Sequence, residues 1–239
     1  MSAGADALRH TIERTAGAWD QHTALRTSFI ARFPTWDPNT DARIAVFAKC
    51  ANVLEAALLS AVYTQRYLLS PEWWEKAFPR MRFEASDRQN AVDSYGSMMK
   101  LSLVHLGFAA IESSFRLYLR ALDAAACLGA TAEFESIYVC LLKRLGLREW
   151  ENLLKLWRLL RNTVHNNGIY LPPSGKDAEV TFRGVTYVFR SGTPAKTDWD
   201  LSVMLFESAQ EMLEAVVNSA ELSAIAGIAD TSAIAWYRR

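Results

Sequence analysis

Residues 153–168 read LLKLWRLLRNTVHNNG, and this stretch is the most informative part of the chain. Leu153, Trp157 and Leu160 recur at spacings of four and three, which places them on one face of an α-helix. The Asn-Asn-Gly that follows is typical of a helix end, and Gly168 is suited to a left-handed backbone conformation. The stretch therefore predicts an amphipathic helix that packs its apolar face on other helices.

Helical patterns cover most of the remaining chain. Two runs of β-branched and aromatic residues, 180–182 and 185–189, flank Arg183-Gly184 and predict a small hairpin. We therefore predict an all-α helical bundle with a small β-hairpin inserted before the last long helix. The expected helices are residues 3–32, 41–69, 91–127, 132–145, 148–165 and 199–222, with a short helix after Pro71.

The chain of 239 residues contains no repeat and no convincing linker. We expect a single domain, in which residues 91–230 form the core and residues 1–90 form a helical extension with no recognised motif. The tail 228–239 is apolar enough to pack back on the bundle.

Composition limits the classes of function. Lys and Arg total 26 and Asp and Glu total 26, so no global charge attracts nucleic acid and any anion site must be local. The three cysteines, Cys50, Cys127 and Cys140, lie among apolar residues and are expected to be buried free thiols in a reducing cytosol. The N-terminus lacks a signal region, and no stretch resembles a membrane span of about 20 apolar residues, so we expect a cytoplasmic protein without membrane contact.

Four side chains of the first stretch share a helix face, because Arg158, Arg161, Asn162 and His165 are related by steps of three, four and seven. The end of the helix favours a protonated His165, whereas the neighbouring arginines favour the neutral ring. Such a histidine suits general acid or base catalysis, and an arginine suits binding of a phosphate group. Asn162 is placed to orient the imidazole or a phosphate oxygen.

Other residues are candidates for binding a substrate. Residues 143–161 carry six basic and two acidic side chains, among them Lys155, which is consistent with an RNA-binding surface or with a solvated helix face. Glu112 and Arg116 form an i, i+4 pair, which is also a common surface salt bridge. Asn166 belongs to the helix end. His105 lies within an apolar pattern and is expected in the core.

The spacing of His, Cys, Asp and Glu indicates no metal site, and we expect no cofactor.

The run 160–168 resembles the signature of the HEPN superfamily (higher eukaryotes and prokaryotes nucleotide-binding domains), in which an arginine and a polar residue precede a histidine near a helix end. Residues 108–116 resemble the earlier helix of bacterial HEPN-like proteins, and the hairpin with its following helix resembles their tail. The likeness covers roughly residues 93–230.

The resemblance implies a metal-independent endoribonuclease of toxin–antitoxin or phage-defence type, in which two copies form one cleft and the RNA 2′-hydroxyl attacks the adjacent phosphate. It implies that His165 is the acid or base, that Arg161 binds the phosphate with Asn162 in support, and that Glu112 and Arg116 face the cleft. The implied partners are RNA, a second copy of the chain, and an antitoxin or regulatory protein.

Spacing leaves the arginine open. The family pattern has four to six residues between arginine and histidine, whereas three separate Arg161 from His165 and six separate Arg158 from it. Two other functions remain. The chain is also consistent with a non-catalytic module that binds RNA, a nucleotide or a partner, and with a structural protein in which the motif only caps a helix.

Overall fold

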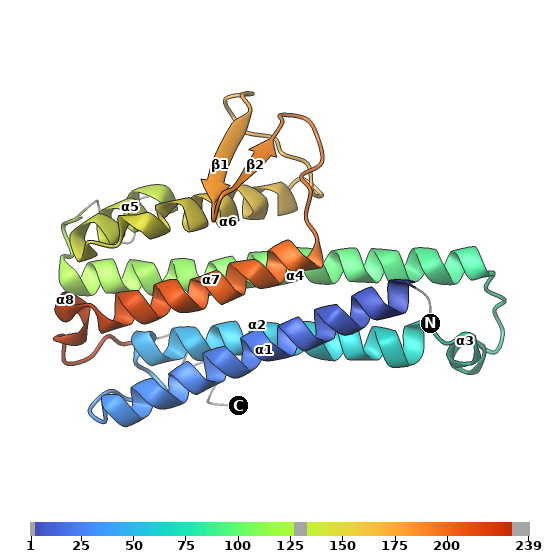
Figure 1. Ribbon diagram of the computed structural model, residues 1–239, viewed down its shortest axis with the longest axis horizontal. Coiled ribbons are helices and arrows are strands. Elements are labelled where there is room, and N and C mark those ends of the chain that lie inside the picture. The colour runs from blue at the N-terminus through green and yellow to red at the C-terminus, as the bar shows by residue number, and fades with distance from the viewer. Residues whose placement is uncertain (1–2, 127–132, 231–239) are drawn as a thin grey trace.

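The structure is a computed structural model that describes residues 3–126 and 133–230. Its frame consists of four long helices, which run lengthwise beside one another (Figure 1). They are α1 (Ala3–Arg32), α2 (Ala42–Tyr63), α4 (Ala85–Leu122) and α7 (Trp199–Asn218).

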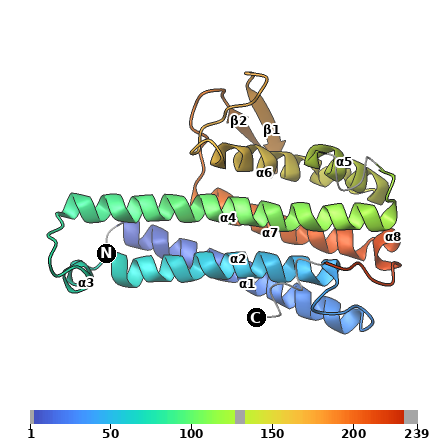
Figure 2. The same cartoon turned by 180° about the vertical axis from the view of Figure 1, so that it is seen from behind.

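A second layer of helices covers α4 on the side away from α2, as the two opposite views show (Figures 1 and 2). It contains α5 (Phe134–Leu145), the 3-10 turn Arg148–Trp150, and α6 (Glu151–Val164). The antiparallel hairpin of β1 (Ala178–Phe182) and β2 (Val185–Phe189) projects from α6, away from α1 and α2.

The smaller elements lie at the two ends of the bundle. At one end α2 continues into a π-helical turn, Thr64–Leu68, followed by α3 (Pro71–Ala77). At the other end α7 leads into α8 (Ala220–Ser223). The predicted fold class is confirmed, because the described chain is helical apart from one two-stranded hairpin before the last long helix.

Helix α4 differs most from its predicted bounds of 91–127, since it begins at Ala85 and ends at Leu122. It begins early because the Asp87 carboxylate accepts a hydrogen bond from the N–H of Glu84, 3.0 Å away, which caps the first turn. It ends early because Asp123 Oδ1 accepts hydrogen bonds from the N–H groups of Ala125 and Ala126 and starts a new turn. The predicted boundary between residues 90 and 91 thus falls inside a continuous helix.

A fully buried ion pair connects the beginning of α2 to the end of the described chain. The Arg43 guanidinium donates through Nε and Nη2 to the two carboxylate oxygens of Asp41, at 2.8 and 2.6 Å. Its Nη1 donates to the carbonyl oxygens of Leu222 and Ile225, and Asp41 also accepts from the N–H of Ile228. Every charge in this network therefore has partners that offset the loss of water.

The structure corrects the expectation that all cysteines are free. Cys50 is a buried free thiol, whereas Cys140 is disulfide-bonded, and Cys127 lies outside the described residues. The cysteines therefore no longer support the expectation that the protein resides in a reducing compartment.

The expectation that no segment is apolar enough to span a membrane is also wrong for residues 42–68. They form a 27-residue helix that contains an 18-residue window of mean hydropathy 1.6. Half of that window is buried inside the bundle. The core helix of a soluble protein passes the same test, so this feature alone is weak support for membrane contact. Of the tail that was expected to pack back, residues 228–230 are described: Ile228 is buried and Ala229 is exposed, while residues 231–239 lie outside the described residues.

Candidate functional site

The end of α6 fixes the backbone on which His165 stands. The N–H of Gly168 donates to the carbonyl of Thr163 at 2.8 Å, and the N–H of Asn167 donates to that of Val164 at 3.3 Å. Asn167 and Gly168 both have positive φ angles, 54° and 86°. This is the Schellman arrangement, so the predicted helix end is confirmed, with Asn167 as the first left-handed residue. His165 occupies the last turn and is exposed.

The crossing of α4 and α6 brings a second histidine to this end. Trp157 is fully buried, and its Nε1 donates a 2.8 Å hydrogen bond to the carbonyl of Val104 in α4. The next turn of α4 carries Gly107, and a Cβ there would lie only 2.7 Å from Cζ2 of Trp157. The absence of that side chain allows the two helices to approach closely, which holds His105 opposite the end of α6.

His105 and His165 form an edge-to-face pair. Their ring centroids are 5.5 Å apart and the ring planes meet at 87°. The expectation that His105 is a core residue with satisfied hydrogen bonds is wrong, since it is half-buried and its Nδ1 has no hydrogen-bond partner in the described chain. The two imidazoles come from helices about 60 residues apart in sequence, one of them exposed and one partly shielded.

Arg161 lies beside this pair. Its guanidinium carbon is 5.7 Å from the centre of the Phe108 ring, and Nη1 donates a weak 3.3 Å hydrogen bond to Oδ1 of Asn162. Its buried Nε has no partner among the described residues. The predicted placement of Arg161, Asn162 and His165 at one helix end is therefore present, and the unpartnered Nε of Arg161 is itself buried.

The surroundings of His105 favour its neutral form. Burial is the main cause that lowers its pKa below the ordinary value of 6.5, and the positive charge of Arg161 and the His165 ring lower it further. Glu112, two helical turns away on α4, acts in the opposite direction. Near neutral pH this ring is therefore able to accept a proton.

Arg158 contacts α5 instead of the histidine pair. Its Nη2 lies 3.0 Å from Oε1 of Glu135 in α5, and its guanidinium also hydrogen-bonds the Tyr138 side chain. The four residues expected on one face are thus divided, because Arg158 is engaged with α5 while Arg161 lies beside the histidines. Arg158 Nε is nevertheless buried without a partner in the described chain.

The remaining predicted residues lie on the same two helices or at the end of α6, and the structure does not bring all of them to the pair. Arg116 is about three turns from His105 along α4, and Lys155 is about three turns from His165 along α6. Glu112 and Arg116 form the predicted ion pair on α4, with Nη2 and Oε1 2.5 Å apart, and both are half-buried. Asn166 donates a long 3.4 Å hydrogen bond to the carbonyl of Asn162. Lys155 lies half-buried two turns before Asn162 on α6.

His105 and Phe108 are the site residues that sequence analysis did not identify. Together with Glu112 they are spaced by three, four and seven on α4, and this spacing is the signal that would have placed them on one face.

The histidine pair lines none of three hollows in the described chain. These hollows lie between α1, α2 and α4, between β2 and α7, and between α2 and α4, and neither His165 nor Arg161 lines any of them. The described residues also contain no group of three or more His, Cys, Asp or Glu side chains placed to hold a metal ion. No protein-family model, curated protein or solved structure matches the chain.

Proposed function

We propose that the protein is a HEPN-like endoribonuclease that cleaves RNA without a metal ion, using His105, His165 and Arg161. The observation that carries the proposal is the 5.5 Å pairing of two imidazoles beside a guanidinium that has an unpartnered Nε. Cleavage of RNA by its own 2′-hydroxyl needs a base, an acid and a cation, and these three groups supply one of each.

The roles follow from the surroundings of each ring. His105, whose pKa is lowered, takes the proton from the 2′-hydroxyl as its oxygen attacks the adjacent phosphorus. His165, exposed at the helix end, gives a proton to the departing 5′-oxygen. Arg161 stabilises the negative charge on the phosphorane, since its planar fork matches phosphate oxygens. The products are a 2′,3′-cyclic phosphate and a 5′-hydroxyl. Arg158 is the weaker candidate for stabilising the phosphorane, because Glu135 already offsets its charge.

A second copy of the chain completes the site in this proposal. His165 is exposed and neither histidine lines any of the three hollows described above, so in this proposal the second copy supplies the walls that hold an RNA backbone in place. Two such surfaces facing each other across a two-fold axis would form a cleft with four imidazoles and two guanidiniums. A role in defence or as a toxin, with an antitoxin or regulatory partner, rests on the family resemblance alone.

The experiment incubates the purified protein with a mixture of structured and single-stranded RNA in buffer containing EDTA, and measures fragment size and end chemistry. We expect wild type to produce cyclic phosphate ends, and His165→Ala and His105→Ala each to lose at least a hundredfold in rate. His10→Ala is the matched control, because it removes an exposed histidine from α1 and should leave the rate unchanged. Circular dichroism and thermal unfolding verify that each variant folds.

Two outcomes would reject the proposal. Cleavage that survives in both histidine variants would place the chemistry elsewhere, and cleavage that EDTA abolishes would require a metal. If wild type does not cleave but binds RNA with an affinity that Arg161→Ala reduces, the same surface is the binding module considered from the sequence.

A further inference from the structure

One edge of β2 is unpaired in the described chain. The hairpin closes through Arg183 and Gly184, whose φ angles of 48° and 77° are those of a type I′ turn. In such a hairpin the first pair after the turn is hydrogen-bonded, and bonded and non-bonded pairs then alternate. The N–H and C=O groups of Thr186 and Val188 therefore point away from β1.

The outer edge of β1, in contrast, is covered by α6. Nδ2 of Asn152 donates a 2.9 Å hydrogen bond to the carbonyl of Thr181, the residue that pairs with Thr186. No described residue makes an equivalent bond to the backbone of Thr186 or Val188. Unpaired N–H and C=O groups along a strand are a template for a further strand.

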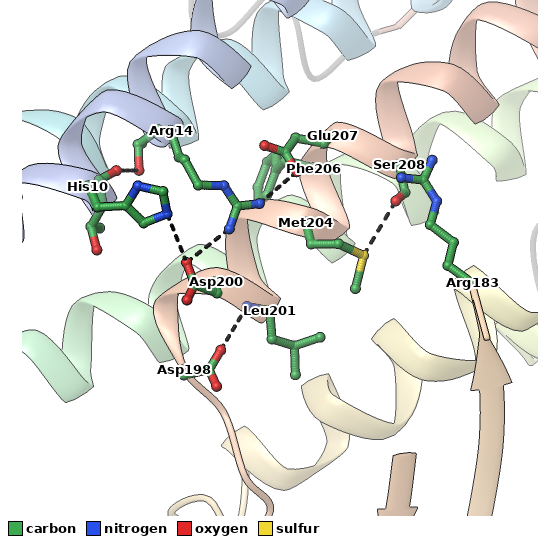
Figure 3. Close-up of polar contacts among 12 residues, drawn as sticks. His10, Arg14, Arg183, Asp198, Asp200, Leu201, Met204, Phe206, Glu207 and Ser208 are labelled. Carbon is green, nitrogen blue, oxygen red and sulfur yellow. Dashed lines mark hydrogen bonds and ion pairs between the residues drawn. The ribbon is translucent and has the colours of Figure 1, made fainter. Parts of the chain in front are cut away.

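A hollow of about 620 Å³ runs along this free edge. All five residues of β2 line it, and its floor includes Leu160 from α6 together with Leu201 and Met204 from α7. Figure 3 shows Leu201 and Met204 projecting from α7 on the side where the hairpin strands approach. The hollow therefore combines a row of backbone hydrogen-bonding groups with an apolar floor, the two features that bind an extended peptide.

Two cations and two carboxylates line the hollow, and one of these cations has no ion pair with a described residue. Asp198 Oδ1 accepts a hydrogen bond from the N–H of Leu201, and Asp200 Oδ1 lies 2.9 Å from Nη1 of Arg14. Figure 3 marks both contacts with dashed lines. Arg14 is also paired with Glu207 at 2.7 Å. Exposed Lys196 has no ion pair with any described residue. A carboxylate on the bound chain would complement it.

The edge is also recessed. The segment that carries Lys196 and Asp198 descends beside β2 from the top of the hairpin to the start of α7 (Figure 1) and lines the hollow. In a second copy the β2 edge would lie behind the corresponding Lys196–Asp198 segment, so the two segments would keep the two β2 edges apart. A single extended chain does not have this obstacle, which favours a peptide over a second copy.

We propose that this hollow, the β2 cleft, binds an extended peptide segment of a partner protein, which adds to β2 as a third strand. Apolar side chains of the segment alternate toward Leu201 and Met204, and an acidic side chain pairs with Lys196. The proposal is independent of any ribonuclease activity, since none of the residues in the β2 cleft belongs to the histidine site.

The test uses two synthetic hexapeptides with blocked ends, which alternate valine and threonine in opposite registers and carry one central glutamate. Hydrogen exchange followed by NMR on the whole protein reports each backbone amide. We expect exchange at Thr186 and Val188 to slow at least tenfold with one of the peptides. A peptide N-methylated at the amides that face β2 should bind at least tenfold more weakly, whereas methylation of the opposite amides should not matter.

Variants of the protein make the test independent of the peptide design. Thr186→Pro removes an outward N–H that the hairpin does not use, so it should weaken binding at least tenfold while the hairpin signals persist. Lys196→Glu should weaken binding of the glutamate peptide and strengthen binding of a matching lysine peptide. Unchanged binding in Thr186→Pro, or unslowed exchange at residues 186 and 188 with both peptides at millimolar concentration, would overturn the proposal. Self-association that Thr186→Pro abolishes would assign the edge to a second copy instead.

Discussion

Gly107 and Trp157 set the distance between α4 and α6, because a single Cβ on Gly107 would lie 2.7 Å from the indole and would also collide with Phe206. Trp157 is itself fixed by its hydrogen bond to the carbonyl of Val104 and by full burial. The positions of the two histidines therefore depend on a residue that contacts neither of them directly.

We expect Gly107→Ala to lower the free energy of unfolding by about 1–3 kcal/mol, since the added methyl group overpacks a rigid contact. Urea denaturation measures it. Gly96→Ala in the same helix is the control, because a Cβ there meets no atom within 4 Å. That variant should be more stable by about 0.5–1 kcal/mol, as alanine favours a helix over glycine. Equal effects at the two positions would contradict the packing explanation.

The buried pair of Asp41 and Arg43 predicts a large cost of removing one partner. Arg43→Met leaves the Asp41 carboxylate buried without its cation, and we expect a loss of about 3–5 kcal/mol in the free energy of unfolding. Arg144→Met, which removes surface ion pairs with Glu221 and Asp123, should change stability by less than about 1 kcal/mol. Comparable losses in the two variants would show that burial of the pair does not matter.

His22 predicts a loss of stability in acid. Burial lowers its pKa from 6.5 to about 4, although its ring nitrogen Nε2 lies 3.2 Å from the carbonyl oxygen of Phe206. Between about pH 4 and pH 6.5, His22 is therefore protonated in the unfolded state and neutral in the folded state. The contribution is fully present above pH 6.5 and is lost as pH falls toward 4, and its size is on the order of 3 kcal/mol.

Urea denaturation at pH 7, 5.5 and 4.5 tests this prediction. His22→Gln should show a weaker fall in stability across the range, because glutamine does not titrate. His10→Ala, which changes an exposed histidine, should follow the wild-type curve. A wild-type slope that persists unchanged in His22→Gln would assign the acid sensitivity to other groups.

The lowered pKa of His105 predicts how its titration responds to its neighbours. Arg161→Gln removes a positive charge that disfavours the protonated ring, so the pKa of His105 should rise. Glu112→Gln removes a charge of opposite sign and should lower it. NMR titration of the histidine ring protons measures both shifts. Shifts of the same sign in the two variants would contradict the electrostatic account.

Cys50 provides a report on opening of the core. Burial raises the pKa of its thiol to about 12, and the thiolate is the form that alkylating reagents attack. Alkylation at pH 8, located by peptide mass mapping, should therefore leave Cys50 unmodified in the folded protein and modify it rapidly in urea. Rapid modification of the folded protein would indicate that α2 opens locally.

The sequence was sufficient for the elements whose patterns are local. Spacing of apolar residues predicted the long helices, and Arg183-Gly184 between β-branched runs predicted the hairpin. The ends of α4 were missed because Asp87 and Asp123 cap the helix through side chains that periodicity does not report.

The candidate site was predicted only in part, for a similar reason. The end of α6 with His165 was evident, whereas His105 was hidden within an apolar pattern on a helix far away in sequence. Periodicity placed Arg158 and Arg161 on one face. The direction of each side chain, however, depends on the residues of neighbouring helices, and Arg158 turns toward Glu135 of α5, with which it forms an ion pair. Such partners are set by tertiary packing.

The network around Asp41 and Arg43 also has a consequence for the order in which contacts form while the chain is synthesised. The carbonyl groups that complete the coordination of Arg43 belong to residues 222 and 225, about 180 residues further along. During translation the guanidinium therefore lacks these two partners until residue 225 has left the ribosome. Helices α1 and α4, the main neighbours of α2, are synthesised well before that point, so the buried ion pair gains its last partners only after these neighbours are present.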